Sequence, residues 1–407
     1  MRARPDLLDP ASPSGIEVFQ LTAETVPSCH VYMEAPVFAP DSRRFVLHRS
    51  AHAHGSDRLD PEHRYFLCDV SDGSLAPLTT EVGATAPVVS PDGRFFYYVV
   101  FAGGRVTLTR VGLDGSDLRD VAAIDAAPGE KRFRPSSVYP IATIRSDGRR
   151  FAVPVNFRDV RSRAHLFSLI VFDLETGVAT KVLDGPSWCN IHPQYCRSTD
   201  PVLMRDILVQ ENHGNEHDAE GRTVKLSGGA GADIHVIRDD GADFRDMPWG
   251  RDGDEFCQGH QCWRGTTAWA ITSTVNLDPD ESRLIEAIPA SAAGHIGIRT
   301  PGGVRNDLSR TMPHPAFSHF GTDTDGSTMI SDAARWDEGG RLFRIDLDAP
   351  GRGPAKRFTY LFSPRCSCVK NNHIHPFLSP DGRTGFFNSD ESGVLQAYMI
   401  RGFASVL

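Results

Sequence analysis

The 407-residue chain has no long hydrophobic run and no excess of positive charge, and each absence argues against a class of protein. No run of about 18 apolar residues occurs, so we expect no membrane-spanning helix. The net charge is −9 and no Lys/Arg cluster stands out, which argues against a nucleic-acid partner. Residues 1–15 lack the apolar core of a signal peptide, so we expect a cytoplasmic protein.

Cysteine and helical periodicity are equally sparse. The eight cysteines form no C-x-x-C pair, which disfavours a structural zinc site and predicts buried, reduced thiols. No stretch holds a period of 3.6 residues for long, so long helices are not expected. With 37 Gly and 28 Pro, the composition instead fits many short strands joined by turns.

A short phrase returns seven times: a small or apolar residue, then Ser/Ala-Pro-Asp-Gly or a degenerate form of it, then an apolar run. Three copies are clear and four are fainter. They start at Ala35, Ala86, Ala142, His192, Gly259, Ser318 and His375. The spacing of about 50 to 70 residues is close to that of a four-stranded propeller blade, and Asp-Gly is a hairpin turn. We therefore predict an all-β, seven-bladed β-propeller that occupies residues 1–407 as one domain.

The ends of the chain and two internal segments complete this prediction. Residues 1–20 are expected to be an N-terminal extension that contributes a strand to ring closure, and Leu395–Ile400 should belong to the seventh blade. Two Gly-rich segments, Glu211–Asp233 and Pro289–Arg310, are expected to be loops over one face, where binding residues tend to lie.

Histidine occupies the phrase position in the later repeats. His192, His260, His319 and the pair His373 and His375 lie there, and His30 precedes the first copy. The first strand of each blade lines the central channel, so equivalent positions should converge near the axis. Two histidines at i and i+2 point to the same side of a strand, and with a third imidazole they can hold a divalent metal. The repeat register therefore predicts a metal site.

These residues resemble the oligogalacturonate lyases, seven-bladed polysaccharide lyases that use Mn²⁺ to cleave short pectate fragments by β-elimination. The resemblance spans nearly the whole chain. It is carried by Cys29-His30, His192-Pro193-Gln194-Tyr195, Gly259-His260-Gln261-Cys262-Trp263, Ser318-His319 and His373-Ile374-His375-Pro376.

The resemblance implies roles for several of these residues. His319, His373 and His375 would bind the metal, and His260 would be the general base, with Trp263 as the aromatic residue that follows it. If His260 is the base, we expect a gap one sugar wide between its ring and the metal. Further candidates for substrate contact are Trp263, His30, His192, His213 and His217.

Two positions depart from the family. Lys370 stands where the family has a ligand Gln, so Asn371 or Asn372 would supply an oxygen instead. Asp233 stands where the family has an Arg near the substrate, and Arg197 and Arg264 are candidates to replace that cation.

The sequence thus predicts a metal-dependent lyase that acts on a small acidic oligosaccharide, and it gives no oligomeric state. One alternative is a related metal-dependent enzyme acting on another acidic or oxidised sugar, which Asp233 and Lys370 would favour. Another is a non-catalytic binding platform, which predicts no convergence of histidines. A serine peptidase would need a hydrolase domain with Gly-x-Ser-x-Gly, which the chain lacks.

Overall fold

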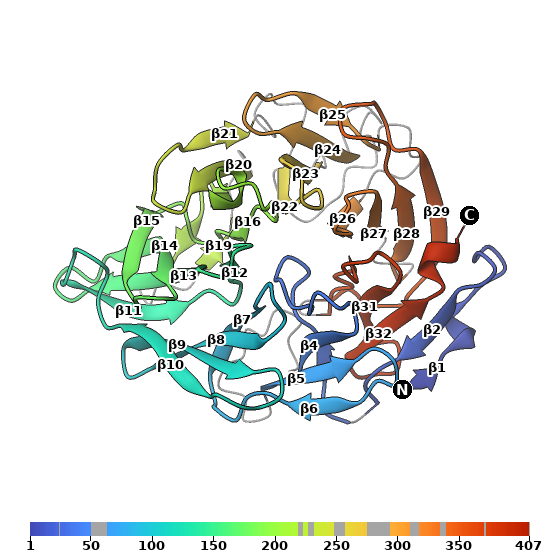
Figure 1. Cartoon of the computed structure of the whole chain (residues 1–407), viewed down its shortest axis with the longest axis horizontal. Helices are drawn as coiled ribbons and strands as arrows, with labels where there is room; N and C mark the ends of the chain where they lie inside the picture. The colour runs from blue at the N-terminus through green and yellow to red at the C-terminus, as the bar shows by residue number, and fades with distance from the viewer. Residues whose placement is uncertain are drawn as a thin grey trace.

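The structure is a computed structural model, and it describes most of the chain. The described residues are 1–23, 25–49, 63–218, 223–226, 232–247, 257–274, 294–309, 317–333, 339–369 and 372–406. Seven antiparallel sheets lie around one axis, as Figure 1 shows, so the predicted all-β, seven-bladed β-propeller is confirmed. Within the described residues, no helix is long and apolar enough to cross a bilayer.

The first three blades follow the chain from the inner strand outward. The first contains β3 (Ser28–His30), β4 (Arg44–Arg49), β5 (Arg64–Asp69) and β6 (Leu75–Pro77). The second contains β7 (Ala84–Val89), β8 (Phe95–Ala102), β9 (Arg105–Gly112) and β10 (Arg119–Ile124). The third has a divided inner strand, β11 (Phe133–Val138) and β12 (Thr143–Ile144), then β13 (Arg150–Asp159), β14 (His165–Asp173) and β15 (Ala179–Gly185).

The next three blades have the same plan. The fourth contains β16 (Gln194–Tyr195), β17 (Asp206–Asn212), β20 (Ala232–Arg238) and β21 (Arg245–Met247). A separate hairpin, β18 (Glu216–His217) with β19 (Thr223–Lys225), lies between β17 and β20 in sequence. The fifth contains β22 (Cys257–Trp263), β23 (Trp269–Thr274), β24 (Gly294–Arg299) and β25 (Arg305–Asp307). The sixth contains β26 (Phe317–Thr322), β27 (Thr328–Ala333), β28 (Arg341–Asp346) and β29 (Arg357–Phe362).

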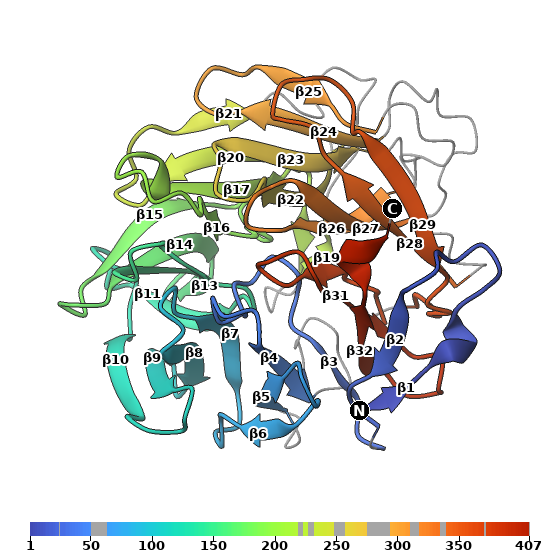
Figure 2. The same ribbon diagram turned by 45° about the vertical axis from the view of Figure 1, so that its right-hand side comes forward.

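The seventh blade joins the two ends of the chain. Its inner strands are β30 (Phe377–Leu378), β31 (Gly385–Ser389) and β32 (Gln396–Arg401), and its outer strands are β2 (Glu17–Gln20) and β1 (Arg2–Ala3). Figures 1 and 2 show the blue β2 beside the red β32. Short 3₁₀ turns occur at Pro5–Leu7, Leu203–Arg205 and Phe403–Ser405.

Two expected loops need correction, because both contain strands. Pro289–Arg310 includes β24 and β25, and its alternating Ile296 and Ile298 are buried at 5% and 0% exposure. Glu211–Asp233 begins at the end of β17, contains β18 and β19, and ends inside β20. Glycine-rich composition suggested loops here, but the apolar alternation of β24 marks a strand.

Among the described residues, one large hydrophobic cluster lies at each of the seven interfaces between neighbouring blades, and Cys29 and Leu395 form a small eighth cluster. Second strands such as β13 are buried on both faces, whereas the outer strand β10 has no buried residue and is mostly half-buried. All eight cysteines are buried thiols that form no disulfide, as the sequence predicted.

The Asp-Gly turns hold neighbouring blades together at one end of the disc. In the second blade, the Ser90 hydroxyl bonds the Asp92 carboxylate at 2.6 Å and Gly93 adopts a φ of 68°. A Cβ on Gly93 would lie 2.8 Å from a side-chain carbon of Pro40 in the preceding turn. The turn therefore needs glycine both for its backbone conformation and for its close contact with the turn of the preceding blade.

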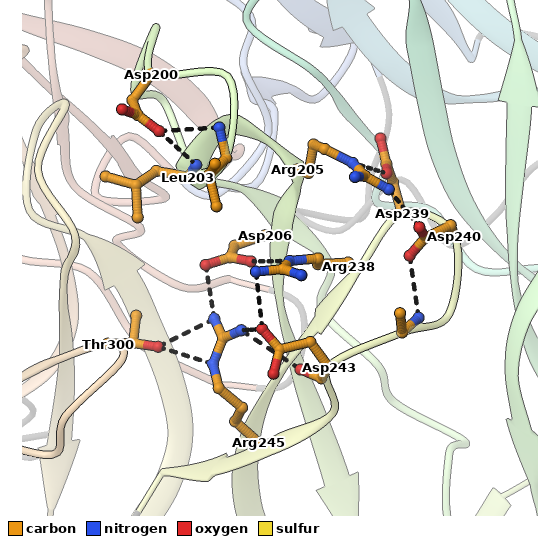
Figure 3. A network of polar contacts seen from close by, with 12 residues as sticks. Asp200, Leu203, Arg205, Asp206, Arg238, Asp239, Asp240, Asp243, Arg245 and Thr300 are labelled. Carbon is orange, nitrogen blue, oxygen red and sulfur yellow. Dashed lines mark hydrogen bonds and ion pairs between the residues drawn. The ribbon is translucent and has the colours of Figure 1, made fainter.

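Hydrogen bonds and ion pairs also link the outer parts of neighbouring blades. Figure 3 shows Arg245 of β21 between Asp206, Asp243 and Thr300. Its guanidinium lies 2.6 Å from the Asp206 carboxylate and 3.1 Å from the Thr300 hydroxyl of the fifth blade. Asp206 is 2% exposed, so Arg245 compensates a buried carboxylate at this position.

Candidate metal and catalytic site

The inner strands of all seven blades are short, interrupted or bulged. In the sixth blade, Phe317 pairs with Ala333 and Phe320 with Ser331, so Ser318 and His319 face a single residue, Asp332. In the fifth, residues 258–260 face Ser273 alone, because Cys257 pairs with Thr274 and Gln261 with Thr272. A bulge re-aims the side chains that it carries, and here the re-aimed side chains include His260 and His319.

The remaining irregularities have other forms. His192 and His375 precede prolines and have positive φ values of 47° and 42°. In the first blade, His30 pairs with Leu47 and the next bridge is Phe38 with Phe45, so residues 31–37 face only Val46. That excursion carries Tyr32 and Glu34, both buried at 3% exposure. The convergence predicted from the repeat thus arises where the strands are irregular.

His319, His373 and His375 form a three-histidine cluster. One ligand nitrogen from each lies within 4.8 Å of the others, a spacing at which one metal ion can contact all three. The ring centroids of His319 and His375 are 4.4 Å apart, and those of His373 and His375 are 5.3 Å apart. Burial lowers the pKa values of His319 and His373, which favours the neutral imidazoles that metals require.

Asp332 of β27 orients one member of this cluster. The His319 backbone N–H donates to one Asp332 oxygen at 2.7 Å, and His319 Nδ1 lies 3.0 Å from the other. A carboxylate accepts from Nδ1–H, so Nε2 is left with a lone pair for a ligand. Burial raises the pKa of Asp332 to about 7.

His260 lies beside the cluster. Its ring centroid is 4.3 Å from that of His319, so no sugar fits between these two rings. A substrate must instead approach both rings from the same side. Burial, followed by the nearby His319 and His192, lowers the pKa of His260 well below its usual value, so the ring is neutral near pH 7. Its buried Nδ1 has no hydrogen-bond partner within the described residues.

His192 belongs to a second group of side chains close to the cluster. Its Nδ1 lies 2.8 Å from Glu34 Oε2 and its Nε2 lies 2.7 Å from the Tyr139 hydroxyl. The ring of Tyr32 makes edge contacts with His192 at 5.2 Å and with His375 at 4.7 Å between centroids. One aromatic ring therefore connects the His192 group to the three-histidine cluster.

Two predicted substrate contacts lie in the core instead. His30 is 0% exposed, its Nε2 is 2.8 Å from the Tyr398 carbonyl, and Phe377 and Phe386 pack on its ring. Trp263 is 1% exposed and donates from Nε1 to the Gln194 carbonyl at 2.8 Å. Neither can contact a substrate, and both stabilise interfaces between blades.

The two candidate arginines follow the inner strands of the fourth and fifth blades. Arg264 is 3% exposed and donates to the backbone carbonyls of Gly326 and Asp348, so it ties the fifth blade to the sixth. Arg197 follows β16, five residues beyond His192. Its neighbour Ser198 accepts a hydrogen bond from Ser146 in an Asp-Gly turn. At about 3.3 Å per residue, both arginines lie toward the turn end of the inner strands.

The last two predicted site residues have no described contact with the cluster. His217 lies in β18, with Asn215 2.6 Å from its Nε2 and Phe167 4.7 Å from its ring centre. Asn371, the proposed oxygen ligand, lies outside the described residues, as does Lys370. Asn372 is described and donates from Nδ2 to Asp390 at 2.8 Å.

Sequence reasoning missed Tyr32, Glu34, Tyr139 and Asp332. Asp332 had a detectable signal, because it follows the apolar Met329-Ile330 in a strand that is buried throughout. Glu34 also had one, as a carboxylate between Met33 and the apolar start of the first phrase. Buried carboxylates are rare without a partner, and each of these is bonded to a site histidine.

Comparison with solved structures supports the fold. An oligogalacturonate lyase in complex with manganese matches with a TM-score of 0.70 and 20% identity, over 98% of this chain and 96% of that chain. An oligogalacturonate lyase from Vibrio parahaemolyticus matches with a TM-score of 0.68 and 17% identity, over 97% and 96%. The propeller domain of the Trilobed protease from Pyrococcus furiosus gives 0.51 and 10%, over 92% and 95%.

No protein-family model matches the sequence, and no curated protein matches it. At these identities, the resemblance inferred from the sequence is confirmed for the fold. The chain has the propeller of the oligogalacturonate lyases and differs from the two solved examples at most positions.

Proposed function

We propose that this protein is a metal-dependent lyase that cleaves short oligosaccharides containing uronic acid, of the oligogalacturonate type, by β-elimination. The observation that carries the proposal is the cluster of His319, His373 and His375 at the axis of a propeller that a manganese-bound oligogalacturonate lyase shares. The products would carry a double bond between C4 and C5 of the uronate.

The three histidines fit a divalent ion, most simply Mn²⁺, because imidazoles suit such ions and the cluster leaves positions open for a substrate. Asn371 is the proposed further ligand. When bound, the ion would neutralise charge that develops on the substrate carboxylate. Asp332 holds His319 with Nε2 toward the cluster, which readies the ligand before any ion arrives.

His260 is the proposed general base. Removal of the C5 proton breaks the C5–H bond, and the electron pair forms the C4=C5 double bond as the C4–O4 bond breaks. A neutral imidazole can accept this proton, and burial keeps His260 neutral by lowering its pKa. Its position beside His319 brings the base next to the place where the carboxylate on C5 would be held.

A second candidate is a related enzyme acting on another acidic or oxidised sugar. Asp233, which stands where the resemblance expects an arginine, is bonded to His213 at 2.8 Å. Glu211 lies close to both His213 and His235, so this part of the fourth blade presents carboxylates and histidines. An anionic sugar extending there would meet like charge, which favours a shorter or less charged substrate.

The remaining parts of the proposal concern location and partners. Eight buried cysteines without a disulfide fit a reducing compartment such as the cytoplasm. The expected partner is a small acidic oligosaccharide, with neither nucleic acid nor a membrane as a partner. The convergence of histidines counts against a non-catalytic binding platform, which does not require clustered histidines.

The test combines elemental analysis of the purified protein with an ultraviolet assay for unsaturated products across a panel of uronides. His373→Ala should lose the metal while the propeller stays folded, because His373 lies outside the strands. His165→Ala, a histidine of β14 that makes no contact with the cluster, is the matched control and should keep metal and activity. Full metal occupancy in His373→Ala would contradict the ligand assignment. A wild-type protein inactive on every uronide would contradict the proposed reaction.

A further inference from the structure

Three side chains from three different blades form a hydrogen-bonded chain beside the three-histidine cluster. Glu34 comes from the excursion of the first blade, Tyr139 from the gap between β11 and β12, and His192 from the residues before β16. Glu34 and His192 are 3% and 5% exposed, whereas Tyr139 is half-buried. The chain therefore leads from a buried carboxylate to a half-buried tyrosine.

The direction of the hydrogen bonds identifies where the protons lie. The Tyr139 hydroxyl donates its one proton to Asn190 Oδ1, so it must accept from His192 Nε2, 2.7 Å away. Nε2 therefore carries a hydrogen. A second proton lies between His192 Nδ1 and Glu34 Oε2, which are 2.8 Å apart. Burial raises the pKa of Glu34, which favours retention of that second proton.

The proposed reaction needs a proton at a second place. The oxygen that leaves C4 carries negative charge until it is protonated. In a galacturonate the C4–O4 bond and the C5–H bond lie on opposite faces of the ring. His260, which takes the C5 proton, therefore cannot deliver one to O4 in the same step. A separate donor on the other face is required.

We propose that Tyr139 is the general acid of this site and that His192 and Glu34 reprotonate it. Tyr139 donates its hydroxyl proton to the leaving O4, His192 Nε2–H replaces that proton, and the proton between Glu34 and Nδ1 completes the transfer. The inference rests on the proposed function, since it assigns a second catalytic residue to that elimination. The C5 carboxylate would be held at the three-histidine cluster, and C4 adjoins C5. Tyr32 lies between His192 and His375, and the Tyr139 hydroxyl is bonded to His192, so the donor lies on the side of the cluster where O4 would be.

The experiment compares two substrates with different needs for an acid. An oligogalacturonide has a poor leaving group, whereas a galacturonate carrying 4-nitrophenol at O4 releases a stable aryloxide without a proton. Tyr139→Phe should lose about 10²- to 10⁴-fold on the oligogalacturonide and less than about tenfold on the nitrophenyl substrate. His260→Ala should lose activity on both. Tyr360→Phe, which removes a hydroxyl bonded to Asp9, is the matched control and should change neither.

Equal losses on both substrates, or full activity of Tyr139→Phe on the oligogalacturonide, would overturn the assignment. A second measurement tests the proton relay of Glu34, His192 and Tyr139 without requiring turnover. Nitrogen-15 NMR of histidine-labelled full-length protein should find a hydrogen on Nε2 of His192, with a resonance that shifts in Tyr139→Phe. A bare Nε2 would overturn the relay even in an active enzyme. If the wild type cleaves no uronide, the proposed function fails, and the NMR result decides the relay separately.

Discussion

Asp332 decides which nitrogen of His319 faces the cluster, although it binds no substrate itself. Both of its oxygens are used by His319, one by the backbone and one by the ring. The alternative ring tautomer would present Nε2–H to a metal ion, which repels it. A histidine at the correct position therefore binds a metal only when its ring has the correct tautomer, and the carboxylate of Asp332 fixes that tautomer.

Asp332→Asn should lower metal affinity by about 10- to 100-fold, because an amide does not fix the tautomer of His319 as a carboxylate does. Titration of the metal-free protein with Mn²⁺ measures the affinity. Asp346→Asn on the neighbouring β28, a carboxylate that bonds Arg344, is the control and should leave affinity unchanged. Unchanged affinity in Asp332→Asn would mean that packing alone orients His319.

At the scale of residues, the sequence predicted the histidines better than their partners. Equivalent positions in successive repeats share an environment, so His260, His319 and His375 could be placed together from register alone. His30 and Trp263 fit the same pattern but are buried, because register fixes a position along a strand without fixing the face that the side chain takes. Tyr139 precedes Pro140 as His192 precedes Pro193, but both Tyr139 and Glu34 lie before the predicted start of their repeats, so the pattern did not point to them.

At the scale of elements, the site depends on strands that are not regular. A regular inner strand points alternate side chains into the channel and between the blades, which leaves few positions for a site. The bulges of β22 and β26 add residues without a paired partner. The seven-residue excursion after β3 adds Tyr32 and Glu34. Propensity predicted the strands, but the length of an excursion depends on tertiary packing.

Gly259, inside the bulge of β22, tests this dependence. Its φ is 79°, and a Cβ there would lie 2.5 Å from Nε2 of Gln210, which is 1% exposed. Gly104 has a similar φ of 75° and open space around it. Gly104→Ala should cost only the strain of placing an alanine at a positive φ, about 1 to 2 kcal/mol in the free energy of unfolding. Gly259→Ala should cost about 1 to 3 kcal/mol more through overpacking and displace His260.

Urea unfolding of both variants measures these costs, and turnover of the folded proteins reports on His260. Equal destabilisation of the two variants would show that Gln210 moves aside without penalty. In that case the neighbouring strands would determine the shape of the bulge, rather than the close approach of Gly259 to Gln210.

At the scale of the whole molecule, closure depends on a buried ionic contact as well as on strand pairing. Arg4, 7% exposed, pairs with Glu391 in the β31–β32 turn and with Asp6 at 2.7 Å. Hydrogen bonds from Arg4 lower the pKa of Asp6 to about 2 and also lower that of Glu391. Carboxyls with depressed pKa values stabilise the fold above their unfolded values, near pH 4, and that stabilisation is lost as the pH falls through the folded values.

Glu391→Gln should therefore lower the melting temperature at pH 7, with a smaller difference from the wild type near pH 2. Thermal unfolding over this pH range checks the prediction. Asp41→Asn removes the exposed pair with Arg44 and should have little effect at any pH. A difference for Glu391→Gln that does not change with pH would assign the effect to packing instead of charge.

The pairing of β2 with β32 also has a consequence for synthesis of the chain. Residues 17–20 leave the ribosome long before their partners at 398–401 are made. At about 5 to 20 residues per second, the first strand waits roughly 20 to 80 seconds for its partner. During that time its backbone edge is available to other chains. A chain that terminates early leaves this edge permanently open, so an incomplete product differs from a finished one in a feature that chaperones and proteases can detect.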